Sequence, residues 1–299
     1  MNQGTRPAEP APFAADWLAL REPFDLAARS EGESRHDLQG AVGAAGGPVR
    51  VLDLGCGTGA NLRALAPRLA GTQQWTLVDH DPRLLASLAP AMARWCAANG
   101  LRWQPGAGPH ARIAGPHWQL ELHWRQADLV QALDALPLDG QRLVTASALL
   151  DLVSEDWLRR LLARAASARV AMLFALTVDG RHDWSPALAG DAQVLARFAA
   201  HQLRDKGFGG AALGPGAVAC ACRHLSALGY STTQAVCDWR IGPQDQPMLE
   251  AMVDGLAEAA MAQAPQDRGD VQAWRGRRLA HLRETHLRVG HVDLLARPT

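Results

Sequence analysis

A short apolar segment followed at once by three alternating glycines constrains the fold of this chain more than any other feature. Residues 49–54 are mostly apolar, as is typical of a buried parallel strand, and glycines stand at positions 55, 57 and 59. Glycine lets the backbone turn sharply and lets a ligand contact bare main chain. Open α/β sheets bind ligands at the carboxyl ends of their strands. We therefore expect a strand, a ligand-binding turn and a helix here.

Strands and helices alternate through the first half of the chain. Strands are predicted at 75–78, 118–124, 143–146 and 170–176, with helices at 82–98 and 155–168. Asp81 and Ser154 precede the two helices as N-caps. Residues 104–116, rich in proline and glycine, are expected to form a loop, and the alternating strand 118–124 is expected at a sheet edge. The rhythm predicts an α/β, Rossmann-like, doubly wound sheet.

The remaining segments suggest how the chain is divided. We expect a disordered head at 1–12, an N-terminal helical cap at 13–46 with helices at 14–20 and 23–29, and one domain at 47–299. Residues 40–48 look like a linker, and a substrate-side insertion is expected at about 177–215. Later helices are predicted at 192–204, 215–228, 247–263 and 270–284, with strands at 231–241 and 288–296.

Composition excludes several classes of protein. Thirty basic residues balance thirty acidic ones, so nucleic-acid binding is disfavoured. The longest apolar run, at 170–176, is far shorter than the roughly 20 residues that cross a bilayer, and the start lacks a signal-peptide pattern; we expect a cytoplasmic protein that does not enter membranes. Five cysteines without paired zinc spacing predict reduced thiols. His281, His286 and His291 are five residues apart, which suits neither one helical face nor a common metal site, so we expect no metal.

Two interpretations of the glycine turn remain, and they differ in the ligand that the turn would bind. Gly55, Gly57 and Ala60 satisfy a loose dinucleotide-binding pattern, whereas the lysine of a phosphate-binding P-loop is missing. Asp53, two residues before the first glycine, is expected to face the crevice, where its charge would repel a pyrophosphate and attract a cation. S-adenosylmethionine carries a sulfonium and an ammonium and no phosphate, so Asp53 favours that ligand.

At this motif the sequence resembles the class I S-adenosylmethionine-dependent methyltransferases, whose first motif is an acidic residue followed by x-Gly-x-Gly-x-Gly, here Asp53 to Gly59. The resemblance covers residues 49–176 well. It implies a seven-stranded, mostly parallel sheet with the last strand antiparallel, and S-adenosylmethionine as cofactor. The segments 231–241 and 288–296 would supply the last strands.

The resemblance also assigns cofactor contacts. Asp79 ends the second strand and would hold both ribose hydroxyls, a role that two carboxylate oxygens can fill. Asp128 would accept from the adenine amino group, while Leu129 and His80 would flank the ring. The remaining positions lie in the turn and after the fourth strand: Asp53, Gly55, Cys56, Gly57, Gly59 and Ser147.

Acceptor binding is expected in the segments that follow strands four and five. Trp184 and Lys206, the single lysine beside 29 arginines, would contact a small polar acceptor. His182 or His201 would remove its proton because histidine titrates near neutrality, and Asp151 is the alternative base. The chain lacks an Asn/Asp-Pro-Pro-Tyr/Phe segment and a Pro-Cys nucleophile, so O-, N- or C-methylation of a small molecule remains.

Two other functions stay open. The chain could bind S-adenosylmethionine as a sensor or scaffold without turnover. An NAD(P) oxidoreductase ranks last, because Tyr230, the single tyrosine, is far in sequence from Lys206. The acceptor, the atom methylated and the oligomeric state are not specified by the sequence.

Overall fold

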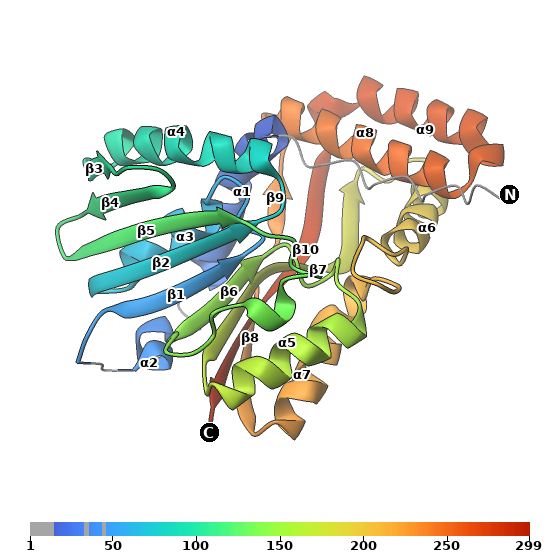
Figure 1. Cartoon of the computed structure of the whole chain (residues 1–299). Helices are drawn as coiled ribbons and strands as arrows, with labels where there is room; N and C mark the ends of the chain where they lie inside the picture. Colours follow the sequence, from blue (N-terminus) through green and yellow to red (C-terminus); the bar gives the residue numbers. More distant parts are fainter. Residues whose placement is uncertain (1–14, 33–35, 44–45) are drawn as a thin grey trace, which may run out of the picture.

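A computed structural model describes residues 15–32, 36–43 and 46–299, so the expected disordered head at 1–12 lies outside the described residues. The described chain contains a ten-stranded sheet in the order β3-β4-β5-β2-β1-β6-β7-β10-β8, with β9 paired to β10 (Figure 1). The strands are β1 (Val49–Leu54), β2 (Gly71–Asp79), β3 (Arg102–Pro105), β4 (His110–Ala114), β5 (Trp118–Gln126), β6 (Leu143–Ser147), β7 (Ala171–Ser185), β8 (Tyr230–Val236), β9 (Trp239–Ile241) and β10 (His286–Pro298).

The centre of the sheet has the predicted doubly wound arrangement. Strands β5, β2, β1, β6 and β7 are parallel to one another, and the connection from β5 back past β2 and β1 to β6 places a topological switch between β1 and β6. β10 is antiparallel to β7 and β8, which confirms the reversed last strand. The carboxyl ends of β1, β2, β5 and β6 therefore meet at one edge of the sheet, where the ligand is expected.

The expected count of seven strands is wrong, because β3, β4 and β9 are additional. The segment 104–116 is a hairpin rather than a loop: Gly106 donates its amide proton to the His110 carbonyl (2.8 Å), and β4 pairs with β5. β5 therefore lies inside the sheet and not at its edge. The expected strand 231–241 is interrupted at residues 237–238 and forms β8 and β9, which both pair with β10.

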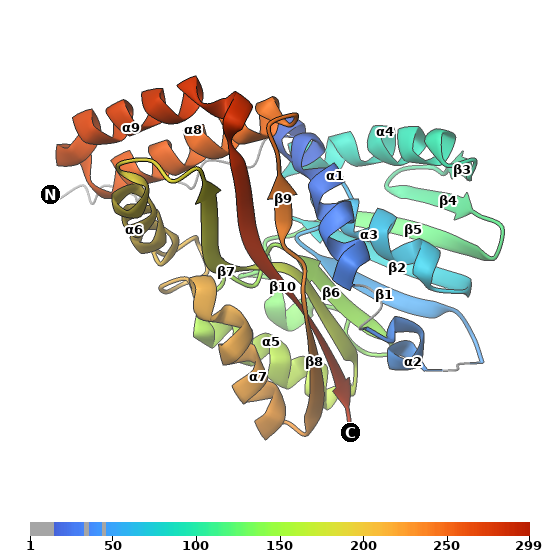
Figure 2. The same ribbon diagram turned by 180° about the vertical axis from the view of Figure 1, so that it is seen from behind.

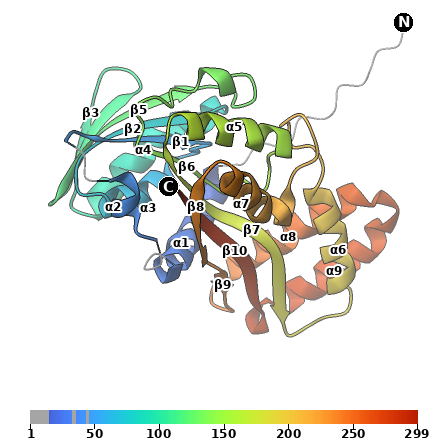
Figure 3. The ribbon, with the colours of Figure 1, turned by 90° about the horizontal axis from the view of Figure 1, so that it is seen from below.

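Helices cover both faces of the sheet. α3 and α4 lie on one face, α5 and α7 on the other, and α1 lies beside α3 (Figures 2 and 3). α6, α8 and α9 gather at the far ends of β7 and β10 around a third apolar core. The helices are α1 (Ala15–Gly32), α2 (Leu38–Val42), α3 (Ala60–Leu65), α4 (Pro82–Ala98), α5 (Glu155–Ser167), α6 (Asp191–Gln202), α7 (Ala217–Ala227), α8 (Gln246–Gln263) and α9 (Arg268–Ala280).

The capping signals set the helix starts as predicted. The Asp81 carboxylate accepts from the Arg83 amide (2.8 Å), and the Ser154 hydroxyl accepts from the Trp157 amide (3.3 Å). The two short helices expected at 14–20 and 23–29 are instead one helix, α1, with Pro23 inside it. α2 occupies the start of the expected linker at 40–48.

The fifth parallel strand is much longer than expected. β7 continues to Ser185, so residues 177–185 are a strand paired with β10 and not a loop. Charged pairs support this extension: Arg181 binds both Asp179 and Asp238, and Arg288 binds Asp183. In the described part of the chain, no helix combines the length and apolarity needed to cross a membrane. All five cysteines are free thiols.

Candidate active site

The glycine turn after β1 is held tightly against β2. The amides of Gly55 and Cys56 both donate to the Val78 carbonyl (2.9 and 3.0 Å). Gly55 and Gly57 have φ angles of +66° and +53°, in the left-handed region that residues with a Cβ rarely adopt. These positions thus require glycine for the shape of the turn. α3 begins directly after the turn, with Gly59 as its N-cap residue.

The acidic residue that ends β2 faces this turn. Asp79 is buried, and its carboxylate accepts from the Gly57 amide (2.7 Å) and the Asp81 amide (2.9 Å). A carboxylate offers about four lone-pair sites, so each oxygen can still accept a further hydroxyl. The His80 ring is largely exposed beside it, with Nδ1 3.4 Å from Asp79 Oδ1. The two side chains therefore lie side by side at the carboxyl end of β2.

Asp128 and Leu129 follow β5 at the same edge of the sheet, but Asp128 is exposed and Leu129 is buried. Asp128 is exposed, and its Oδ1 accepts from the Val130 amide (2.8 Å), which leaves Oδ2 open. Leu129 is buried in the core under α5, and its carbonyl accepts from the Trp157 indole (3.0 Å). Asp128 can therefore reach a ligand, whereas Leu129 has little surface to offer to a ring.

Asp53 is not open to a crevice as expected, because it is fully buried beneath α3. Its Oδ1 accepts from the Asn61 amide group (2.8 Å), and its Oδ2 is buried without a hydrogen-bond partner. Burial raises the pKa of Asp53 to about 7, although the Asn61 hydrogen bond and the nearby Arg29 charge act in the opposite direction. The Asp53 carboxylate, which was expected to attract a cation in the crevice, thus lies beneath α3 and is not exposed at the turn.

α1 covers the turn, and the sequence motif gave no sign of this. A Cβ placed on Gly57 would lie 3.0 Å from Leu18 Cδ1, so the space above this glycine is taken by α1. The Glu22 carboxylate receives two hydrogen bonds from Arg63 of α3 (2.6 Å each), which fixes α1 to the helix after the turn.

A small pocket remains between α1, α3 and the ends of β6 and β7. Its cavity volume is about 10 Å³, roughly the room that one water molecule needs. Arg29 of α1 borders it and donates through Nη1 to the side-chain oxygen of Asn61 (3.0 Å), while its Nε and Nη2 are buried without hydrogen-bond partners and Nε lies 3.8 Å from the Asp293 carboxylate. The pocket is lined by Glu22, Asp25, Leu26, Arg29, Ala60, Asn61, Ala64, Ser147 and Leu176. Ser147 therefore borders this pocket, together with Arg29, a residue that the motif analysis did not name.

Asp151 lies just beyond the end of β6. It is buried, and its Oδ1 has no hydrogen-bond partner. Burial raises the pKa of Asp151 to about 6, and the charges of Arg21 and Lys206 act in the opposite direction. A carboxylate with a pKa near 6 is ionised at neutral pH and can accept a proton from a bound molecule.

Lys206 and His201 are brought together as expected. Lys206 Nζ donates to the His201 carbonyl (3.2 Å) and lies 3.5 Å from His201 Nδ1. Burial, followed by the Lys206 charge, lowers the pKa of His201. The positive charge of Lys206 also acts on the Asp151 carboxylate.

Trp184 and His182 do not join one pocket with these residues. Trp184 is buried in the third core, where it packs against Trp274 (6.4 Å between centroids) and under the Arg278 guanidinium (4.4 Å). The expectation that Trp184 contacts the acceptor is wrong, because residues 177–185 are a paired strand that directs it into the core. The His182 ring meets Phe198 edge-on (5.3 Å), and burial lowers its pKa.

The parallel sheet with a reversed last strand, and the glycine turn facing an acidic residue at the end of β2, define the class I methyltransferase fold. Residues 51–169 match the family model of the methyltransferase domain, from β1 to the end of α5. The chain therefore contains a methyltransferase domain over residues 51–169, with S-adenosylmethionine as its cofactor.

Solved methyltransferase structures superpose on the chain with TM-scores below 0.5. An S-adenosylmethionine-dependent methyltransferase from Thiobacillus denitrificans, in complex with S-adenosylhomocysteine, has a TM-score of 0.44 and 14% identity, covering 95% of this chain and 99% of that one. One from Geobacter sulfurreducens, also with S-adenosylhomocysteine, has a TM-score of 0.42 and 14% identity, covering 93% and 98%. No curated protein sequence matches the chain.

The residues present fit the two charged groups at the amino-acid end of the cofactor. Arg29 has two buried nitrogens without hydrogen-bond acceptors, although Nε lies 3.8 Å from the Asp293 carboxylate, and Asp53 has one buried oxygen without a donor; both residues hydrogen-bond to Asn61. Buried polar groups without partners are costly, so they are favoured binding points for a complementary ligand. A carboxylate would satisfy Arg29 and an ammonium would satisfy Asp53.

Proposed function

We propose that the chain methylates a small acceptor with anionic character, and that Asp151 removes the acceptor's proton. The observation that supports this most is the buried Asp151 carboxylate, which has an unpartnered oxygen and lies next to the end of β6. The positive charges of Arg21 and Lys206 near it favour an acceptor that carries a negative or strongly polar group. The acceptor oxygen, nitrogen or carbon would face the methyl group from this side.

The chain's own residues provide binding, orientation and proton removal. Asp79 would hold the ribose hydroxyls, Arg29 and Asp53 the amino-acid end, and Asp128 the adenine amino group. The cofactor, when bound, supplies the electrophilic methyl group. Positioning an acceptor in line with that group accounts for much of the acceleration in transfers of this kind.

Asp151 is a better candidate for the base than either histidine. His182 is held by Phe198 and by a contact of Nδ1 with the Gly180 carbonyl (3.4 Å). His201 Nδ1 faces the Lys206 ammonium, which competes with an incoming proton. His201 remains the second candidate because it lies beside Lys206, whose positive charge also acts on Asp151.

Cofactor binding tests the first part of the proposal. Asp79→Ala and Arg29→Gln should each weaken binding of S-adenosylhomocysteine about 10-fold to 100-fold, because each removes a buried charged hydrogen-bonding group. Isothermal titration calorimetry measures this directly. Arg83→Ala is a suitable control, since Arg83 is exposed beside Asp81. Absence of binding to the unmodified chain at millimolar ligand would contradict the proposal, and binding without product in an acceptor screen would favour a sensor.

Binding should also move α1. Leu18 lies against the Gly57 turn, so a nucleoside that contacts this turn must displace it. We expect hydrogen exchange of residues 15–30 to change on addition of S-adenosylhomocysteine, while α9 at the far end of the molecule stays unchanged. Equal exchange in α1 with and without a saturating ligand would mean that the cofactor enters by another route.

A further inference from the structure

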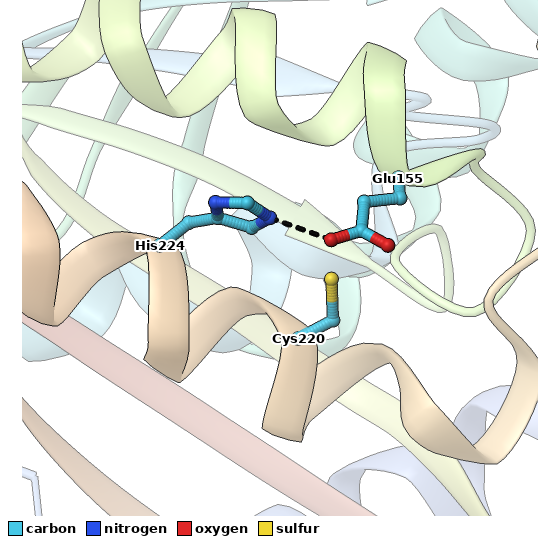
Figure 4. Close-up of side chains that lie close together, drawn as sticks. All are labelled: Glu155, Cys220 and His224. Atoms are coloured by element: carbon cyan, nitrogen blue, oxygen red, sulfur yellow. Dashed lines mark hydrogen bonds and ion pairs between the residues drawn. The ribbon is translucent and has the colours of Figure 1, made fainter.

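A group of metal-binding side chains lies between α5 and α7, apart from the residues assigned above. Glu155 is the first residue of α5, and Cys220 and His224 stand four residues apart on one face of α7. Figure 4 shows the three side chains converging on one point between the helices. Their donor atoms all lie within 4.8 Å of one another, and His224 Nε2 is 2.8 Å from Glu155 Oε1.

The donor set suits a borderline transition metal. Zinc takes thiolate sulfur at about 2.3 Å and imidazole nitrogen or carboxylate oxygen at about 2.0–2.2 Å, which places tetrahedral ligands about 3–4 Å apart. The present separations need only small side-chain movements to reach that geometry. Three protein ligands leave the fourth position to water or another ligand.

The surroundings allow an ion to enter and to be held. Cys220 is almost fully buried, whereas Glu155 is exposed and His224 is half-buried, so the site opens to solvent on the side of the carboxylate. Arg223 also binds Glu155 (3.3 Å), but its side chain is mostly exposed and free to turn away. His224 and Glu155 hydrogen-bond to each other, and the Cys220 sulfur lies within 4.8 Å of both donor atoms.

We propose that Glu155, Cys220 and His224 form a binding site for Zn²⁺ or a similar ion, which fastens α5 to α7. The sequence led us to expect no metal, because the cysteines lack paired zinc spacing and the C-terminal histidines are not spaced as ligands; Glu155, the third member of this group, is 65 residues from Cys220. The site is independent of the proposed acceptor chemistry. A metal ion binds cysteine as the thiolate, so binding releases the Cys220 proton and should tighten as pH rises.

Cobalt(II) is the probe of choice because its bound thiolate absorbs in the near ultraviolet and its tetrahedral form absorbs strongly in the visible. One equivalent of Co²⁺ added to the full-length reduced chain should give both absorptions, and Zn²⁺ should displace them. Zn²⁺ should also raise the thermal midpoint of the chain, as any ligand of the native state does.

Matched variants identify the ligands. Cys220→Ser should abolish the thiolate absorption, and Glu155→Gln and His224→Ala should each weaken Co²⁺ binding at least about tenfold. Cys222→Ser, two residues away on the same helix and only partly buried, should leave the spectrum unchanged. The proposal is overturned by a wild-type titration without thiolate absorption, or by an absorption that survives Cys220→Ser. If Cys220→Ser does not fold, unaltered binding by both other variants is sufficient to reject it.

Discussion

Asp151→Asn should lower the rate of methyl transfer by about 10²- to 10⁴-fold, the usual contribution of a positioned general base. Asparagine has nearly the same shape but cannot accept the acceptor's proton. The affinity for S-adenosylhomocysteine should stay within about twofold, because Asp151 lies on the acceptor side of the site. The measurement is release of S-adenosylhomocysteine with the best acceptor from a panel of small carboxylates, phenols and amines.

The pH profile of the same reaction separates a base from a structural residue. A base must be ionised, so the wild-type rate should rise with pH through about 6, the pKa of buried Asp151, and then level off. In Asp151→Asn this rise should disappear. Asp156→Asn is the matched control, since Asp156 is an exposed carboxylate on the next helix. If the rise persists in Asp151→Asn and is lost in His201→Ala, the base is His201.

Short sequence motifs, taken without contacts between distant segments, were sufficient to predict much of the fold. α4 covers exactly the predicted residues 82–98, because Asp81 and Pro82 fix its start independently of the rest of the chain. The hairpin of β3 and β4 was missed since its prolines and glycines resemble a loop, and its pairing with β5 is a contact between segments. β7 was predicted too short for a similar reason: the charged residues 179–183 are stabilised by Asp238 and by pairing with β10.

In the candidate site, too, the residues of a local motif were predicted and those that depend on contacts between distant segments were missed. Asp79 and the glycine turn follow from a contiguous motif, and the structure places them together. Arg29 was missed because its contacts with Asn61 and Asp293 depend on how α1 folds back over the turn. The i, i+4 spacing of Arg21, Asp25 and Arg29 on one helix was the available signal. Such spacing also occurs on solvated helix faces, so it could not show which partner those charges meet.

Asp53→Asn should make the chain more stable at pH 8 while weakening cofactor binding at least about tenfold. The native state holds the Asp53 proton up to a pKa of about 7, whereas the unfolded state loses it near 3.8. The free energy of unfolding therefore falls as pH rises from about 4 to 7, by an amount on the order of 4 kcal/mol if no other group compensates. Asparagine removes this penalty but leaves a buried N–H group unpaired, so a net gain of about 1–2 kcal/mol at pH 8 is expected.

Urea unfolding at pH 5 and pH 8 measures this difference. The gain should shrink towards pH 5, where wild-type Asp53 is mostly protonated in the native state and the charge is already absent. Asp128→Asn provides the control, because Asp128 is exposed at the same edge of the sheet and asparagine can still accept from the Val130 amide. A loss of stability at pH 8, with cofactor affinity unchanged, would show that Asp53 is a structural partner of Asn61 and not a binding residue. A gain in stability together with a loss of affinity would mean that the chain retains a destabilising buried carboxylate because the cofactor's ammonium needs it.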